Sequence, residues 1–160
     1  MKKGILSLLC AFAFATMAMA QGKVTSIDLE GKTYTVTRDI PADIKAHILG
    51  KYLCNTKNGD PIVELRADGT GLFQRHDVPA DNIEFWVDCD EQGVIRKQTG
   101  PTGNYGITLL YKYIGGSRDG QYDLMGVVVA LDGFGTPIRN RPEITGAYSA
   151  IYGERYKPIN

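Results

Sequence analysis

The feature that most constrains the fold is the alternation of apolar and polar residues along most of the chain. A period of two is typical of β-strands, because successive side chains point to opposite faces of a sheet. Clusters of Gly, Asp and Asn separate the alternating runs and are typical of tight turns. No helix of useful length is expected between the runs, which argues against parallel strand–helix–strand units. The sequence therefore predicts an all-β protein with antiparallel strands.

Two local elements precede the main run of strands. Residues 23–40 (KVTSIDLEGKTYTVTRDI) predict a hairpin that turns at Glu30–Lys32 and is rich in Thr, Val and Ile, which suit strands. Residues 41–50 (PADIKAHILG) are the one plausible helix, because a proline suits the first turn and a glycine can end it. Ile44 and Ile48 would lie one helical turn apart on a shared face.

Further strand pairs are expected around the turns ADGTG (67–71), DEQG (90–93) and GGSRDG (115–120). The segments 104–114 and 122–131 are the best candidates for central, buried strands. One face of the first would carry Tyr105, Ile107, Leu109, Tyr111 and Tyr113. The spacing predicts an up-and-down antiparallel barrel of about eight strands, with one short N-terminal helix and an extra N-terminal hairpin.

The N-terminus is typical of a secretory signal peptide, residues 1–20. Two lysines precede a short apolar run at 4–15, and Ala18-Met19-Ala20 provides a cleavage pattern before Gln21. A large leucine before Cys10 argues against a lipid anchor there. We expect an exported protein, periplasmic or extracellular, whose mature chain has no membrane span.

The mature chain, residues 21–160, is long enough for one domain with its own core. Removal of the signal peptide leaves 16 Lys and Arg residues against 18 Asp and Glu residues. This slightly acidic balance argues against a nucleic-acid partner, which favours a basic excess.

Three segments resemble lipocalin-like (calycin-type) β-barrel domains. They are LGKY (49–52), ELRADGTGLFQ (64–74) and YGERYKP (152–158), and Tyr52 stands where lipocalins carry Trp in a Gly-x-Trp motif. The resemblance spans roughly residues 41–158, and the overall style is similar to small secreted proteins of Bacteroides-type bacteria. It implies a barrel whose interior can hold a small apolar ligand, although fold alone does not give function.

The segment 86–97 (WVDCDEQGVIRK) has part of a calcium-loop pattern. Asp88, Asp90 and Gly93 match the first, third and sixth positions of an EF-hand loop, but Thr99 replaces the bidentate acid of the twelfth. The flanking residues predict strands, whereas an EF-hand needs helices. The pattern favours a hairpin turn with a positive φ at Gly93.

Cys54 and Cys89 are the two cysteines of the mature chain, and an oxidising compartment makes a disulfide between them a candidate. Two separate buried thiols are the alternative. His47 and His76 lack metal-ligand spacing, and no serine lies in a nucleophile motif. We therefore assign no catalytic residue, no metal and no cofactor.

Aromatic side chains are the positive functional signal, because Tyr and Trp join an apolar body to a polar tip. The ligand-lining candidates are Trp86, Tyr105, Leu109, Tyr111, Tyr113, Tyr122, Tyr148 and Tyr152. The alternative, which we favour for these residues, is that they pack in the core, because barrels of this size are often filled by their own side chains.

The leading hypothesis is a non-enzymatic binding module for a small apolar or amphipathic ligand. The alternative is an envelope protein–protein interaction or structural module with a filled barrel. A carboxylate-based hydrolase ranks third, since no motif supports it.

Overall fold

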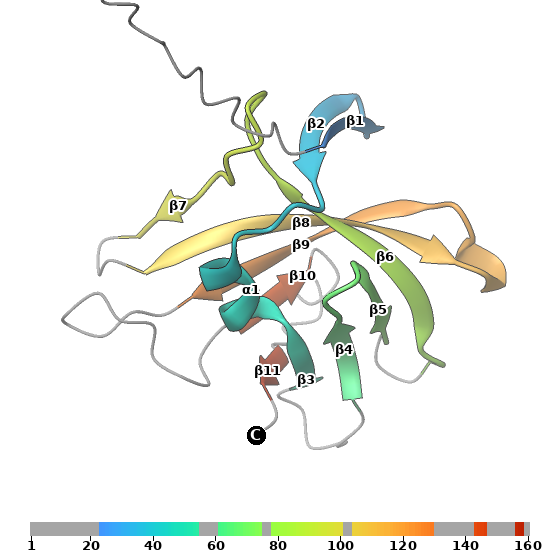
Figure 1. The fold of residues 1–160 in the computed structure, drawn as a ribbon. Coiled ribbons are helices and arrows are strands. Elements are labelled where there is room, and N and C mark those ends of the chain that lie inside the picture. Colours follow the sequence, from blue (N-terminus) through green and yellow to red (C-terminus); the bar gives the residue numbers. More distant parts are fainter. Residues whose placement is uncertain are drawn as a thin grey trace, which may run out of the picture.

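The computed structural model describes residues 23–54, 61–74, 78–100, 104–129, 143–146 and 156–158, with only the backbone at 53–54, 61–62, 143–146 and 156–158. The described part of the chain is mostly antiparallel β-sheet with one short helix (Figure 1). Its elements are β1 (Val24–Leu29), β2 (Lys32–Thr37), α1 (Ala42–Ile48), β3 (Gly50–Cys54), β4 (Pro61–Leu65), β5 (Thr70–Phe73), β6 (Asp81–Asp88), β7 (Gln98–Thr99), β8 (Tyr105–Ile114), η1 (Gly116–Arg118), β9 (Tyr122–Val129), β10 (Glu143–Gly146) and β11 (Tyr156–Pro158). In this part of the chain, no helix has the length and apolar character needed to cross a membrane.

The predicted N-terminal hairpin is confirmed. β1 and β2 pair in antiparallel register up to Leu29 and Lys32, which leaves a two-residue turn. Glu30 and Gly31 both have positive φ angles, 51° and 79°. Two-residue hairpins favour this geometry because its twist matches that of the flanking strands.

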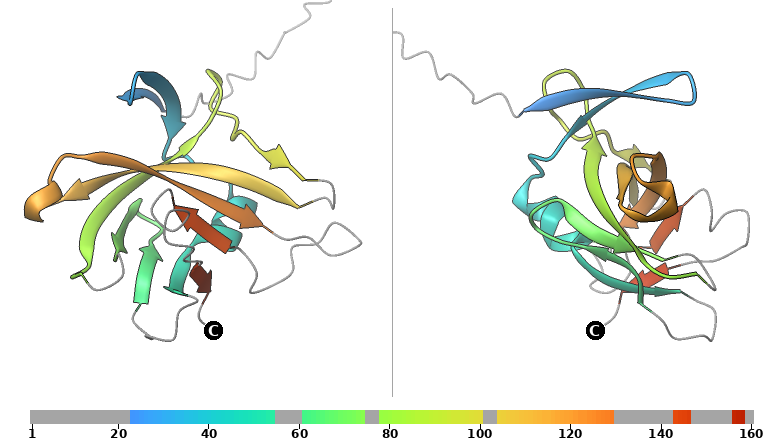
Figure 2. Two further views of the ribbon diagram at one scale, coloured as in Figure 1. Left: turned by 180° about the vertical axis from the view of Figure 1, so that it is seen from behind. Right: turned by 90° about the vertical axis from the view of Figure 1, so that its right-hand side faces the viewer.

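The remaining strands except β7 are joined by a continuous series of antiparallel pairings. From β6 the hydrogen-bonded neighbours run through β5, β4, β3, β11, β10, β9 and β8, and β8 also pairs with β6. Beyond Glu84, where the pairing with β5 ends, Val87 and Asp88 of β6 pair with β2, while Val87 still pairs with Leu109 of β8. The hairpin therefore stands above this point in Figure 1, and the two views of Figure 2 agree.

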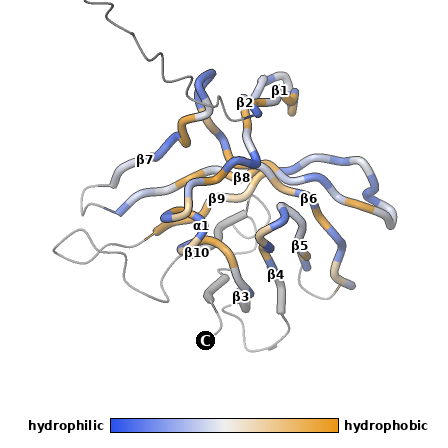
Figure 3. The backbone as a smooth tube through the Cα atoms, viewed as in Figure 1, coloured by the Kyte–Doolittle hydropathy of each residue, from blue (hydrophilic) through white to orange (hydrophobic). Residues whose placement is uncertain are grey.

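One face of each central strand forms the core. Ile83, Phe85 and Val87 alternate along β6 and are buried, as predicted for a half-buried strand. On β8 the predicted shared face is confirmed, since its residues from Ile107 to Tyr113 are buried and Tyr105 is half-buried. Figure 3 shows the hydrophobic positions along β9 and at the end of α1.

The predicted helix is confirmed as α1, which begins after Pro41. Ile44 and Ile48 are buried and belong to the same core cluster as the strands. The hydroxyl of Tyr52 donates a hydrogen bond of 2.5 Å to the carbonyl oxygen of Ile48. This bond satisfies a carbonyl that the end of a helix otherwise leaves without a partner. It fixes α1 against the first strand that follows it.

Candidate functional site

Two of the predicted ligand-lining residues, Tyr111 and Tyr113, are packed into an aromatic cluster with Phe73. The ring centroid of Phe73 lies 5.2 Å from Tyr111 and 6.3 Å from Tyr113, and the two tyrosine rings are 5.3 Å apart. All three side chains are at most 2% exposed. These distances are typical of rings in direct contact, so the rings fill the interior here.

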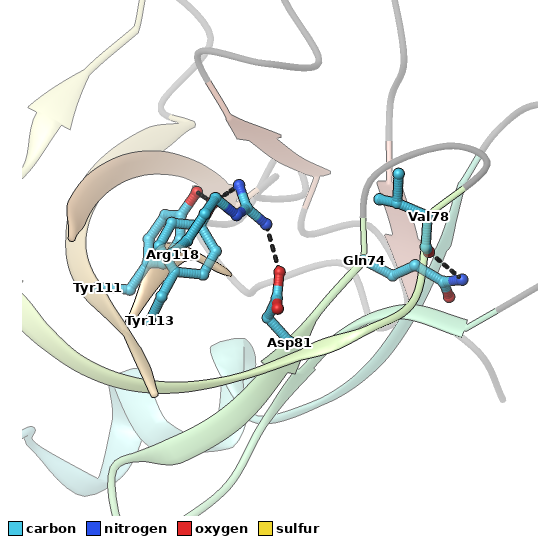
Figure 4. Close-up of polar contacts among 6 residues, drawn as sticks. All are labelled: Gln74, Val78, Asp81, Tyr111, Tyr113 and Arg118. Atoms are coloured by element: carbon cyan, nitrogen blue, oxygen red, sulfur yellow. Dashed lines mark hydrogen bonds and ion pairs between the residues drawn. The ribbon is translucent and has the colours of Figure 1, made fainter. Parts of the chain in front are cut away.

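A short polar network lies at the end of this cluster (Figure 4). Arg118, on η1, places its guanidinium 3.6 Å from the centroid of the Tyr113 ring and donates a 2.6 Å hydrogen bond to the Tyr113 hydroxyl. Its other nitrogen forms an ion pair of 2.5 Å with Asp81 at the start of β6. The sequence predicted only a turn at 115–120, because nothing local indicates which side chain an arginine in a turn will cover.

The Tyr111 hydroxyl lies 3.2 Å from that of Tyr113. Burial raises the pKa of Tyr111, and the neighbouring Tyr113 and Asp123 raise it further. The hydroxyl therefore stays protonated near neutral pH and is a hydrogen-bonding group, not a base.

Two other predicted residues, Trp86 and Tyr122, lie on the opposite face of the sheet. Their rings are 6.2 Å apart, and Trp86 is opposite Leu110 in the strand register. Arg38 stacks over Trp86 at 4.3 Å and forms an ion pair of 2.6 Å with Glu84. A groove of about 240 Å³ beside them is lined by Lys23, Thr25, Arg38, Asp39 and Trp86.

The remaining candidates are placed separately. Leu109 is fully buried in the core. Tyr105 is half-buried near the N-terminal end of β8, with Lys97 4.7 Å above its ring and its hydroxyl 3.5 Å from Nδ1 of His47. Burial and the charge of Asp43 raise the pKa of Tyr105. Tyr148 and Tyr152 lie outside the described residues. The predicted set is thus divided between the core, the outer face and the end of β8.

The segment that follows β6 forms the expected tight turn. Asp90 accepts hydrogen bonds from the backbone N–H groups of Gln92 and Val94, at 2.9 and 2.8 Å. Gly93 has a φ of 83°, as predicted. The return strand is shorter than expected, because only an isolated bridge joins Cys89 to Ile95 before the chain moves to pair with β8.

The two carboxylates of this segment have separate structural partners. Asp90 caps its own turn, whereas Asp88 lies 3.3 Å from Arg96. Burial raises the pKa of Asp88, and the charges of Arg96 and Lys32 oppose that rise. Within the described residues, no group of three or more His, Cys, Asp or Glu side chains could hold a metal ion.

Cys89 is a free, fully buried thiol in the structure. Burial raises its pKa, with a further contribution from the charges of Asp88 and Asp90, which disfavours the reactive thiolate. Cys54 ends β3, where it pairs with Tyr156 of β11, and its side chain lies outside the described residues. The candidate disulfide between Cys54 and Cys89, which requires Cα atoms within about 7 Å, stays a prediction.

A larger pocket, about 480 Å³, opens between α1 and the turn after β6, and we call it the α1 pocket. It is lined by Asp39, Pro41, Asp43, Ile44, Gln92, Gly93, Val94, Ile95 and Lys97. Ile44 and Ile95 are buried, whereas Val94 is 62% exposed and is one of the large hydrophobic side chains left open to solvent. The sequence predicts a helix and a turn for these two segments but not their proximity, which arises from tertiary structure.

Comparisons of the chain with protein-family models, with curated protein sequences and with solved structures found no match. The geometry of the pockets and clusters is therefore the basis for a functional proposal.

Proposed function

We propose that the chain is an exported, non-enzymatic binding module that holds a small amphipathic molecule in the α1 pocket. The observation that carries the proposal is that the exposed Val94 and the buried Ile44 and Ile95 line one pocket of about 480 Å³. Small-molecule sites have volumes of about 300–1,000 Å³ and combine apolar walls with a few polar groups. The polar groups of this pocket come from Asp39, Asp43 and the other polar lining residues.

The proposed scaffold is a lipocalin-like barrel of eight strands, β3–β6 and β8–β11. The pairing of β6 with both β5 and β8 supports closure. From Ile83 of β6, the paired residues on β5 and β4 lead to Gly50 of β3. From Cys54 of β3, the paired residues on β11, β10, β9 and β8 lead back to β6 at the position of Cys89. The two paths are offset by four residues on β3, from Gly50 to Cys54, and by six on β6, from Ile83 to Cys89. One circuit of the sheet therefore shifts the strand register by ten residues. A stagger of this kind is what a closed barrel of tilted strands requires.

The packed interior favours placing the ligand in the α1 pocket and not among the strands. Phe73, Tyr111 and Tyr113 already contact one another, so a ligand between them would have to displace a ring. The same observation supports a second candidate function, an envelope interaction or structural module with a filled barrel. In that case the outer surface, including Trp86 and Tyr122, would contact a partner protein.

The binding proposal predicts that Val94→Gln weakens the binding of medium-chain amphiphiles about tenfold. Losing the burial of one valine side chain costs about 1.5 kcal/mol, which corresponds to a factor of about ten in the dissociation constant. Val128→Gln is the matched control, because Val128 is an exposed valine on β9 that does not line the pocket. Isothermal titration calorimetry with octylammonium, octanol and octanoate measures the effect.

Native mass spectrometry of protein purified from its own cells provides an independent measurement. The proposal predicts a chain that begins at Gln21 and carries a bound small molecule, which Val94→Gln reduces. If no probe binds, and the native protein has only its own mass, the binding proposal fails and the filled-barrel candidate is favoured.

A further inference from the structure

We infer that the α1 pocket selects a cationic amphiphile, a molecule that joins an ammonium or guanidinium group to a short apolar body. This inference rests on the proposed function and specifies the ligand class. It starts from Asp39 and Asp43, two exposed carboxylates on the α1 side of the pocket. In the described part of the chain, neither carboxylate forms an ion pair or a side-chain hydrogen bond, so both are available to a ligand.

The cationic groups nearby have other contacts. Lys97 is the one cationic residue among the described lining residues, and its ammonium lies 4.7 Å from the centroid of the Tyr105 ring. Arg38, next to Asp39 in sequence, pairs with Glu84 and stacks on Trp86. The lining residues therefore carry two negative charges against one positive charge, and the positive one faces an aromatic ring.

The apolar part of the pocket is on the other side. Val94 and Ile95 come from the turn after β6, and Ile44 is the buried lining residue of α1. The turn holds its shape through the bonds that Asp90 accepts, so Val94 is presented to solvent by a constrained loop. A bound molecule would cover Val94 with its apolar body and place its cationic group near Asp39 and Asp43.

The expected selectivity is moderate, because exposed ion pairs are weak and are screened by salt. Octylammonium should bind about tenfold more tightly than octanol at low salt, and octanoate should bind more weakly than octanol. Raising the salt concentration should reduce the preference for octylammonium without changing the affinity for octanol. The three probes share one chain length, so differences among them report the head group.

The test compares Asp39→Asn and Asp43→Asn with the control Glu30→Gln, an exposed acid at the hairpin tip outside the pocket. Each aspartate variant should lose about threefold in octylammonium affinity and leave octanol affinity unchanged, and the control should match the original protein. Equal affinities for all three probes, with Val94→Gln still weakening them, would overturn the charge inference and leave the binding proposal intact. Binding of none of the probes would overturn both.

Discussion

Replacing Gly71 with alanine is expected to destabilise the protein by about 3 kcal/mol, at the upper end of the usual cost of overpacking. Gly71 lies on β5 between Leu65 of β4 and Ile83 of β6. A Cβ atom added there would lie 2.0 Å from the backbone carbonyl oxygen of Glu64, and 3.3 Å from the Ile83 side chain. A strand backbone cannot move by this amount without breaking its pairing. Urea denaturation followed by tryptophan fluorescence measures the change.

Gly106→Ala is the matched control for this effect. Gly106 also lies within a paired strand, β8, but the nearest atom to an added Cβ is 3.9 Å away, which is an ordinary contact. We expect this variant to change the free energy of unfolding by less than about 1 kcal/mol. Equal losses in the two variants would show that β4, β5 and β6 are not paired in this register.

Replacing Phe73 with alanine is expected to lower the free energy of unfolding by about 3–5 kcal/mol. Phe73 is buried against the rings of Tyr111 and Tyr113, and its removal leaves a cavity in the part of the interior that these rings fill. The same denaturation measurement applies. Phe73→Leu, which retains most of the volume, should cost about 1 kcal/mol and keeps the prediction testable if the alanine variant does not fold.

Tyr34→Ala is the control for the loss of an aromatic ring outside the core. Tyr34 is half-buried on the N-terminal hairpin, where Lys32 lies 4.4 Å from its ring centroid. We expect a loss of about 1 kcal/mol or less for this exposed contact. A Phe73→Ala loss no larger than that of Tyr34→Ala would mean that the interior around Tyr111 is not tightly packed.

The elements that local sequence determines could be predicted. The hairpin at Glu30 and Gly31, the helix around Ile44 and the buried face of β8 all follow from residue types a few positions apart. The positive φ of Gly93 also follows from the residue types of its turn. These features are specified within one element or one turn, so periodicity and turn propensities are sufficient.

The site could not be predicted, because it depends on contacts between distant segments. Trp86 and Tyr111 are both aromatic strand residues, and only the register between β6 and β8 places them on opposite faces. The α1 pocket joins Asp43 to Val94, and no pattern in either segment indicates the other. Arg118 likewise reaches Asp81 across 37 positions of sequence. Strand pairing decides these contacts, and pairing is a property of the whole fold.

Mapping of amide chemical shifts during a titration with octylammonium tests the central claim most directly. If the molecule binds in the α1 pocket, the largest changes should occur at residues 39–48 and 92–97, and Tyr111 and Tyr113 should change little. Changes centred on Tyr111, Tyr113 and Phe73 would contradict this claim, because they would place the ligand among the three rings that pack against one another in the interior.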